Sequence, residues 1–76
     1  MRYPPTQNLG LAVGPDGRNY SLHFYGEDEG AAVITGPVPP PGVLRAVSEV
    51  HREPVGSAAE AAAALLAWRR TEGWPI

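Results

Sequence analysis

One stretch constrains the fold of this chain more than any other, residues 57–73, SAAEAAAALLAWRRTEG. Ser57 can cap a helix, and Glu60 three positions later completes a capping box. The alanine- and leucine-rich body that follows contains no glycine, no proline and no β-branched residue. Gly73 can adopt the left-handed conformation that ends a helix, and Trp74 follows where an apolar side chain usually folds back on the last turn. The sequence therefore predicts a helix with both ends defined.

Size and composition limit the rest of the chain. With 76 residues and no cysteine, it is one domain, residues 1–76, that buries only about 60% of the surface of its unfolded chain. Neither disulfides nor thiolate metal sites can stabilise it. The net charge of -2 lacks the basic excess that binds phosphate backbones. We expect efficient packing or a partner chain to supply the remaining stability.

Hydrophobic alternation predicts an antiparallel meander over residues 9–35. Residues 9–13 and 18–25 alternate around the sequence Gly-Pro-Asp-Gly, which is typical of a hairpin turn. Residues 31–35, AAVIT, are enriched in β-branched residues and apolar on both faces, which indicates a third strand, either in the middle of the sheet or at an edge that another element covers. We expect one face of the hairpin to present Leu9, Leu11, Val13, Tyr20, Leu22 and Phe24.

Two proline-rich segments flank this meander. Residues 1–8 contain Pro4 and Pro5, so we expect a lead-in that is extended or frayed. Residues 36–42, GPVPPPG, predict a stiff, polyproline-like connector from the sheet to a helix. This connector is also the only segment that could serve as a recognition peptide for an aromatic groove.

Residues 43–52 fit two structures. On a helical wheel their apolar side chains form one arc, while Arg45, Glu49 and Arg52 gather opposite. We predict a helix, and hence an α+β fold of a three-stranded antiparallel meander followed by two helices packed on one face. A strand here would instead give a four-stranded sheet plus one C-terminal helix. The expected core is Leu9, Leu11, Val13, Leu22, Phe24, Ile34, Val47, Val50, Leu65 and Trp68.

No motif points to catalysis. His23 and His51 lack metal-ligand spacing, and no serine stands in a nucleophile elbow. Tyr20, Phe24 and Tyr25 near Arg18 could stack on bases, but the net charge argues against direct nucleic-acid binding. We expect no enzyme, no metal and no cofactor, with a small enzyme or ligand-binding domain using His23 or His51 as an alternative.

Two features suggest a partner-binding surface. The turn Glu27-Asp28-Glu29 could form an acidic patch that meets a basic partner. The predicted helix has alanines on its outer side, where a solvated helix is normally charged. We expect this side to face a second surface, either the helix predicted over residues 43–52 or another chain. The candidate partner-binding residues are Glu27, Asp28, Glu29, Ala63, Ala67 and Arg70.

The opening Met1-Arg2-Tyr3-Pro4, a meander and a capped helix resemble in outline the HicB-type antitoxin domain. The Gly-Cys motif and acidic helix start of that family are missing, so no functional residue is carried across. We expect a non-catalytic module that binds and modulates or inhibits a larger macromolecular complex, like phage or mobile-element accessory proteins such as anti-CRISPR inhibitors. An antitoxin-like or regulatory dimer is the alternative. No secretory signal or membrane span is visible, so we expect a cytoplasmic protein.

Overall fold

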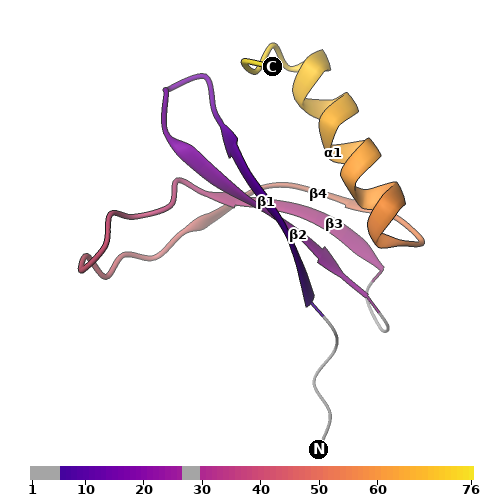
Figure 1. Cartoon of the computed structure of the whole chain (residues 1–76), viewed down its shortest axis with the longest axis horizontal. Helices are drawn as coiled ribbons and strands as arrows, with labels where there is room; N and C mark the ends of the chain where they lie inside the picture. The colour runs from indigo at the N-terminus through magenta and orange to yellow at the C-terminus, as the bar shows by residue number, and fades with distance from the viewer. Residues whose placement is uncertain (1–5, 27–29) are drawn as a thin grey trace, which may run out of the picture.

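In the computed structural model, which describes residues 6–26 and 30–76, the chain forms a sheet covered on one face by a single helix (Figure 1). The strands are consecutive and antiparallel, in the order β1-β2-β3-β4. Their bounds are Thr6–Val13 for β1, Asn19–Tyr25 for β2, Ala31–Gly36 for β3 and Ser48–Pro54 for β4, and α1 spans Ala58–Thr71. The result is a thin two-layer molecule, 34 × 32 × 15 Å.

The predicted hairpin between β1 and β2 is confirmed, with proline and glycine in the roles expected of them. The Gly17 N–H donates to the Gly14 carbonyl, and the Gly14 N–H donates to the Arg18 carbonyl. Gly17 has a φ of 78°, the left-handed value that a three-residue hairpin loop requires at its last position. Asp16 accepts the Arg18 N–H at 3.1 Å and so fixes the turn.

The prediction for β1 is wrong about which side chains face the core. The pairing with β2 shifts between Asn8 and Gly10, which is a β-bulge. A bulge reverses the face on which later side chains lie. Leu9 therefore packs against the core together with Ala12, while Leu11 and Val13 lie on the other face and are 59% and 46% exposed.

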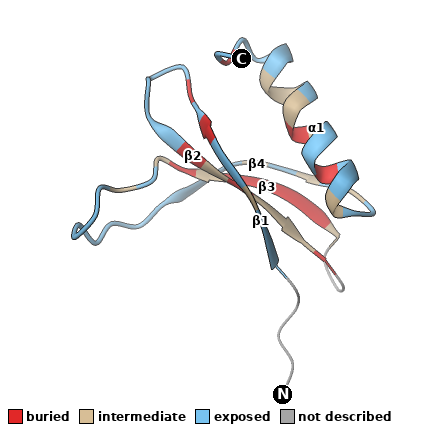
Figure 2. Cartoon of the chain, viewed as in Figure 1, coloured by how far each residue is buried: buried red, intermediate tan, exposed pale blue. Residues whose placement is uncertain are grey.

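The prediction for residues 31–35 is confirmed. β3 lies between β2 and β4, and four of its six residues in succession are buried, as Figure 2 shows in red. Ala32 and Ile34 face the helix and belong to the core. Val33 points to the opposite face and is also fully buried. A strand paired on both sides needs apolar residues on both faces when each face is covered.

The helix predicted over residues 43–52 is wrong, and the four-stranded alternative is correct. Residues 48–54 form β4, which pairs with β3 from Ser48 opposite Gly36 to Pro54 opposite Ala31. Pairing satisfies the backbone groups of β3, which would otherwise be a buried, apolar edge. Val47 and Val50, expected in the core, are exposed. The proline-rich connector therefore leads to a strand and not to a helix.

The boundaries predicted for α1 are confirmed. The Ser57 side chain accepts the Glu60 N–H at 3.1 Å, and the Glu60 carboxylate accepts the Gly56 N–H at 2.6 Å. At the other end Gly73, with a φ of 79°, donates to the Arg70 carbonyl, and Trp74 donates to the Arg69 carbonyl. This is the Schellman pattern. No described helix is long and apolar enough to cross a bilayer.

The core lies between α1 and the first three strands. Leu65 and Ala61 of the helix are fully buried and pack on a floor formed by β2 and β3. Trp74 folds back as predicted, with its ring 5.0 Å from that of Tyr20 and 5.6 Å from that of Trp68. The expected members that are confirmed, fully or in part, are Leu9, Leu22, Phe24, Ile34, Leu65 and Trp68.

Candidate interaction surface

The helix covers only one face of the sheet, so the opposite face carries no other element in the described part of the chain (Figure 1). We call this opposite side the open face. Cross-strand pairing places on it His23 opposite Val33, and Val33 opposite Arg52. The same register brings Leu11, Val13, Ser21, Tyr25, Thr35 and Glu49 to the open face.

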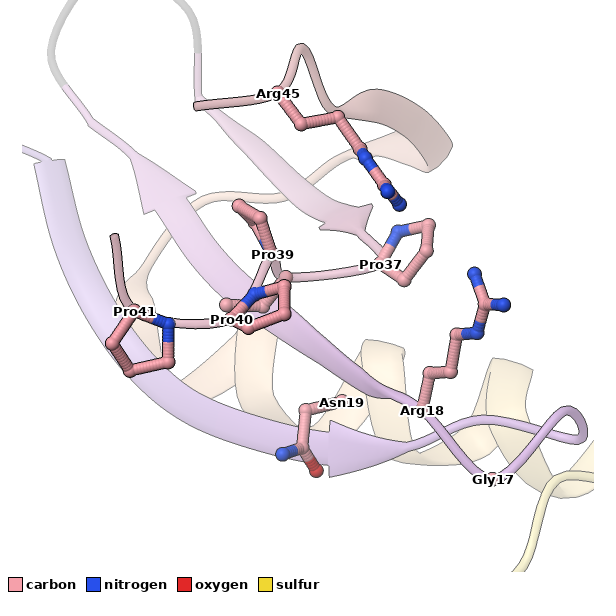
Figure 3. Close-up of a pocket in the computed structure, with 9 residues that line it drawn as sticks. Gly17, Arg18, Asn19, Pro37, Pro39, Pro40, Pro41 and Arg45 are labelled. Atoms are coloured by element: carbon pink, nitrogen blue, oxygen red, sulfur yellow. The ribbon is translucent and has the colours of Figure 1, made fainter. Parts of the chain in front are cut away.

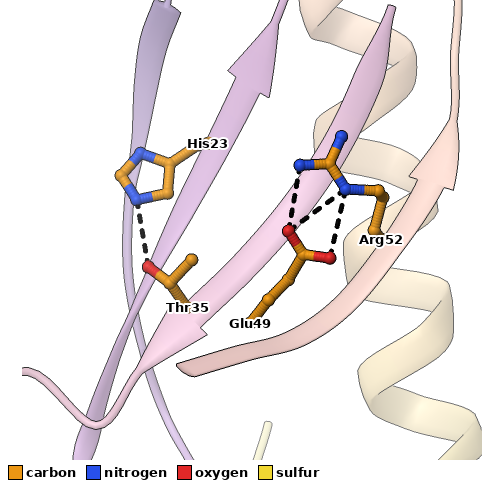
Figure 4. A network of polar contacts seen from close by, with 4 residues as sticks. All are labelled: His23, Thr35, Glu49 and Arg52. Carbon is orange, nitrogen blue, oxygen red and sulfur yellow. Dashed lines mark hydrogen bonds and ion pairs between the residues drawn. The ribbon is translucent and has the colours of Figure 1, made fainter. Parts of the chain in front are cut away.

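Polar side chains cover the middle of the open face. His23 Nε2 lies 3.3 Å from Thr35 Oγ1, and the Arg52 guanidinium donates to the Glu49 carboxylate at 2.9 and 3.1 Å (Figure 4). Arg52 also stands over the Tyr25 ring, 5.7 Å from its centroid, within the range of a cation–π contact. These groups flank Val33 from both neighbouring strands, which explains why it is fully buried without a helix above it.

The contact with Arg52 changes the pKa of Glu49. The hydrogen bonds that Arg52 donates hold the pKa of the Glu49 carboxyl below its usual value, and the positive charge of Arg52 acts in the same direction. The pair is exposed, with about 42% and 45% of the two side chains accessible. An exposed ion pair contributes little to stability. We therefore infer that the main role of this pair is to cover the open face of the sheet.

A long loop projects from one end of this face. Residues 37–47, the proline loop, connect β3 to β4 and extend away from the sheet in Figure 1. At its base the Val38 N–H donates to the Asn19 carbonyl at 2.8 Å, which anchors the loop to β2. Further along, the Val43 N–H donates to the Pro40 carbonyl, and Gly42 has a φ of 82°. Proline followed by a left-handed glycine is typical of a type II turn.

The proline loop presents apolar side chains to solvent. Leu44 is fully exposed (101%), and its neighbour Val43 is 44% exposed. Val38 and Val47, nearer the sheet, are 39% and 47% exposed. Single exposed apolar residues are common on protein surfaces, but several on one projecting segment make that segment a candidate contact surface. Half of the large apolar side chains that are exposed among the described residues lie on this loop.

A groove runs between the proline loop and the β1–β2 turn. It has a volume of about 620 Å³, and the rings of Pro37, Pro39, Pro40 and Pro41 form one wall. Arg18 from the turn and Arg45 from the loop also line it, and Figure 3 shows their side chains converging on Pro37 from opposite sides. Among the described residues neither guanidinium forms a hydrogen bond or an ion pair.

Asp16 lies beside this groove, but both of its carboxylate oxygens already accept hydrogen bonds. One carboxylate oxygen accepts the Tyr20 hydroxyl at 2.8 Å, and the other accepts the Arg18 N–H. The bond from Tyr20 holds the pKa of Asp16 below its usual value, the Arg18 N–H acts in the same direction, and the shared bond raises the pKa of Tyr20. Asp16 therefore stays charged and positions the turn that carries Arg18.

Only some of the partner-binding residues expected from the sequence lie in the described part of the chain. The acidic turn, Glu27, Asp28 and Glu29, lies outside the described residues. Ala63, Ala67 and Arg70 are exposed on the outer side of α1, coloured pale blue in Figure 2. The helix over residues 43–52 that was expected to cover this side does not form. Contact of the outer side with another chain stays a prediction.

The two histidines do not share a site. They pair with consecutive residues of β3, His23 with Val33 and His51 with Ile34, so they lie on opposite faces of the sheet. His51 stacks on Trp68 with the ring centroids 4.3 Å apart, and its Nε2 lies 2.8 Å from Glu53. No group of three or more potential metal ligands occurs among the described residues.

The aromatic side chains considered for base stacking are also divided. Tyr20 and Phe24 face the helix and pack in or against the core. Only Tyr25 lies on the open face, next to His23, with the two rings 6.0 Å apart. A stacking surface for single-stranded nucleic acid needs several accessible rings on one face. The expectation that nucleic-acid binding is absent stays a prediction.

Sequence reasoning missed Leu44 and Arg45 because it placed both in a helix. A sequence clue was present, since Pro40-Pro41-Gly42 lies one residue before Leu44 and predicts a turn. The approach of Arg18 to Arg45 has no sequence clue, because the two are joined only through the pairing of β2 with the base of the proline loop.

Comparison with known proteins adds no identification. No protein-family model, no curated protein and no solved structure matches this chain.

Proposed function

We propose that this chain is a non-catalytic interaction module that binds and modulates a larger macromolecular complex, as phage and mobile-element accessory proteins do. The observation that carries the proposal is the proline loop, which presents a fully exposed Leu44 beside a half-exposed Val43. A projecting apolar side chain becomes a binding anchor when a partner supplies a pocket for it. The partner in this proposal is a protein surface with such a pocket.

The stiffness of the loop favours binding. Prolines restrict the backbone before the partner arrives, so less conformational entropy is lost on association. The hydrogen bond from Val38 to Asn19 fixes the base of the loop, and the turn at Pro40 to Val43 fixes its tip. The backbone is therefore held up to Val43, the residue before Leu44.

Affinity capture with matched variants tests the proposal. The wild-type chain, Leu44→Asp and Ala63→Arg are immobilised and exposed to a lysate of the organism that encodes the protein, at physiological salt. We expect wild type and Ala63→Arg to retain a stoichiometric partner and Leu44→Asp to lose it, because a charge cannot enter an apolar pocket unpaired. Leu44 makes no buried contacts, so all three proteins should give the same circular dichroism spectrum.

The opposite outcomes are equally distinct. Absence of any stoichiometric partner contradicts the proposed function. A partner that survives Leu44→Asp but is lost with Ala63→Arg places the contact on the outer side of α1, where Ala63 is exposed, and contradicts the role of the loop.

A further inference from the structure

Two arginines of the groove converge on the same proline. Arg18 comes from the β1–β2 turn and Arg45 from the proline loop, and both point toward Pro37 (Figure 3). Neither has a hydrogen-bonded or ion-paired partner among the described residues. Two like charges held on one groove repel each other, and a bound anion would relieve that repulsion.

Arg52 shows the contrast with these two arginines. On the open face Arg52 forms a two-oxygen pair with Glu49 and covers Tyr25. The carboxylate nearest to Arg18 in sequence, Asp16, has one oxygen bonded to the Tyr20 hydroxyl and the other to a backbone N–H. The charge of Arg18 acts on Asp16, but both carboxylate oxygens are held by other donors, and no hydrogen bond or ion pair joins the two side chains.

The proline wall of the groove indicates that its ligand has an apolar part. Four proline rings line the groove beside the two guanidinium groups. Its volume of about 620 Å³ falls within the range of about 300–1,000 Å³ found for small-ligand pockets, enough for a few side chains of a bound peptide. Guanidinium groups recognise carboxylates through paired N–H donors, and proline rings offer a surface for an apolar side chain.

We propose that the groove between Arg18, Arg45 and the proline wall binds an acidic peptide segment of the partner protein, with a carboxylate on the arginines and a neighbouring apolar side chain on the prolines. This inference rests on the proposed function and names the chemistry of the partner. It also gives the protein a basic contact point despite its net charge of -2.

Peptide selection tests the inference without knowledge of the partner. A display library of random short peptides is selected on the folded wild-type chain, on the double variant Arg18→Gln/Arg45→Gln and on the control Arg69→Gln, which changes a half-buried arginine of α1 outside the groove. We expect wild type and Arg69→Gln to enrich peptides that combine Asp or Glu with apolar residues. The double variant should lose this enrichment.

Titration of the selected peptide gives the magnitude. Each single variant, Arg18→Gln or Arg45→Gln, should weaken binding by about 10- to 150-fold, since a hydrogen bond to a charged group contributes about 1.5–3 kcal/mol. Replacing every acid of the peptide by its amide should weaken binding further, and added salt should weaken it for wild type. Amide resonances of Asn19 and Val38, at the base of the groove, should shift during the titration.

Several outcomes contradict the inference. Enrichment of neutral or basic peptides contradicts it, as does enrichment of acidic peptides on the double variant. Full competition by inorganic phosphate at equal ionic strength would identify phosphate as the ligand and would contradict the proposal that the groove binds a peptide. These results are independent of the capture experiment, because Leu44→Asp tests the loop tip and leaves both arginines in place.

Discussion

At the scale of single residues, Asp16 shows how much one side chain organises. Its two oxygens accept the Tyr20 hydroxyl and the Arg18 N–H, so it ties the β1–β2 turn to a ring of the core. Tyr20 in turn contacts Trp74 beyond the end of α1. A charged residue in a surface turn therefore connects the hairpin to the helix terminus.

The lowered pKa of Asp16 gives stability a defined pH dependence. A carboxyl whose pKa is lower in the folded state contributes stability above its unfolded pKa, and this contribution is lost as the pH falls through the folded pKa. The reference value for Asp16 is 3.8, so the free energy of unfolding should fall below about pH 4. Asp16→Asn should show a shallower fall in urea titrations across this range.

Glu49→Gln is the matched comparison, because the pKa of Glu49 is lowered by its bonds from Arg52. It should also flatten the pH dependence, while the Tyr20–Asp16 bond and the fluorescence of Trp74 stay unchanged. A fall in stability that is as steep for Asp16→Asn as for wild type would contradict the role assigned to Asp16.

At the scale of elements, the helix and the fourth strand differ in where their conformation is decided. The ends of α1 are specified by residues within one turn of each end, from Ser57 to Gly73. β4 has a weak local pattern, and its conformation follows from pairing with β3 over Ala31 to Gly36. Its one valine, Val50, is β-branched and compatible with either state, so local periodicity alone predicted the wrong one.

Gly73 tests the local specification of α1. Its φ of 79° lies in the left-handed region, and no atom lies within 4 Å of a Cβ placed there. Gly73→Ala should therefore destabilise the protein through backbone strain alone, by about 1–2 kcal/mol, measured by urea unfolding. Gly56→Ala is the matched control, because Gly56 has no positive φ and its Cβ would meet only the Glu60 carboxylate at 3.6 Å.

The control should stay within about 0.5 kcal/mol of wild type. An equal loss in both variants would mean that the helix end is not held by the left-handed glycine.

At the scale of the whole molecule, the sheet and the helix depend on each other. An isolated helix of 14 residues is marginal in water, and the helix face of the sheet would expose Leu22 and Ile34 without it. Both tryptophans lie at the junction, Trp68 on α1 and Trp74 just after it. Among the described residues, neither the sheet nor the helix packs against a second hydrophobic core.

This dependence predicts one cooperative transition. Helical circular dichroism and tryptophan fluorescence should report the same midpoint in urea. Trp68→Phe leaves Trp74 as the only indole of the chain, so its fluorescence then reports the contact with Tyr20 alone. Loss of helical signal at a lower urea concentration than loss of fluorescence would contradict the single transition.

Sequence alone determined the features whose causes lie within a few residues. These are the Pro-Asp-Gly turn, the capped helix, and the buried third strand with its unbroken apolar run. Each depends on hydrogen bonds or backbone preferences that neighbouring residues satisfy. The sequence left open whether the outer side of α1 meets a second helix or another chain, because what covers a helix depends on other elements.

Tertiary structure decided the features that depend on strand pairing. The bulge between Asn8 and Gly10 places Leu11 and Val13 on the face away from the core. Residues 48–54 form a strand because they pair with the side of β3 that β2 leaves unpaired. That same pairing left residues 37–47 as a projecting loop and brought Arg45 to Arg18. Both outcomes follow from satisfying backbone groups between segments far apart in the chain, which local periodicity does not encode.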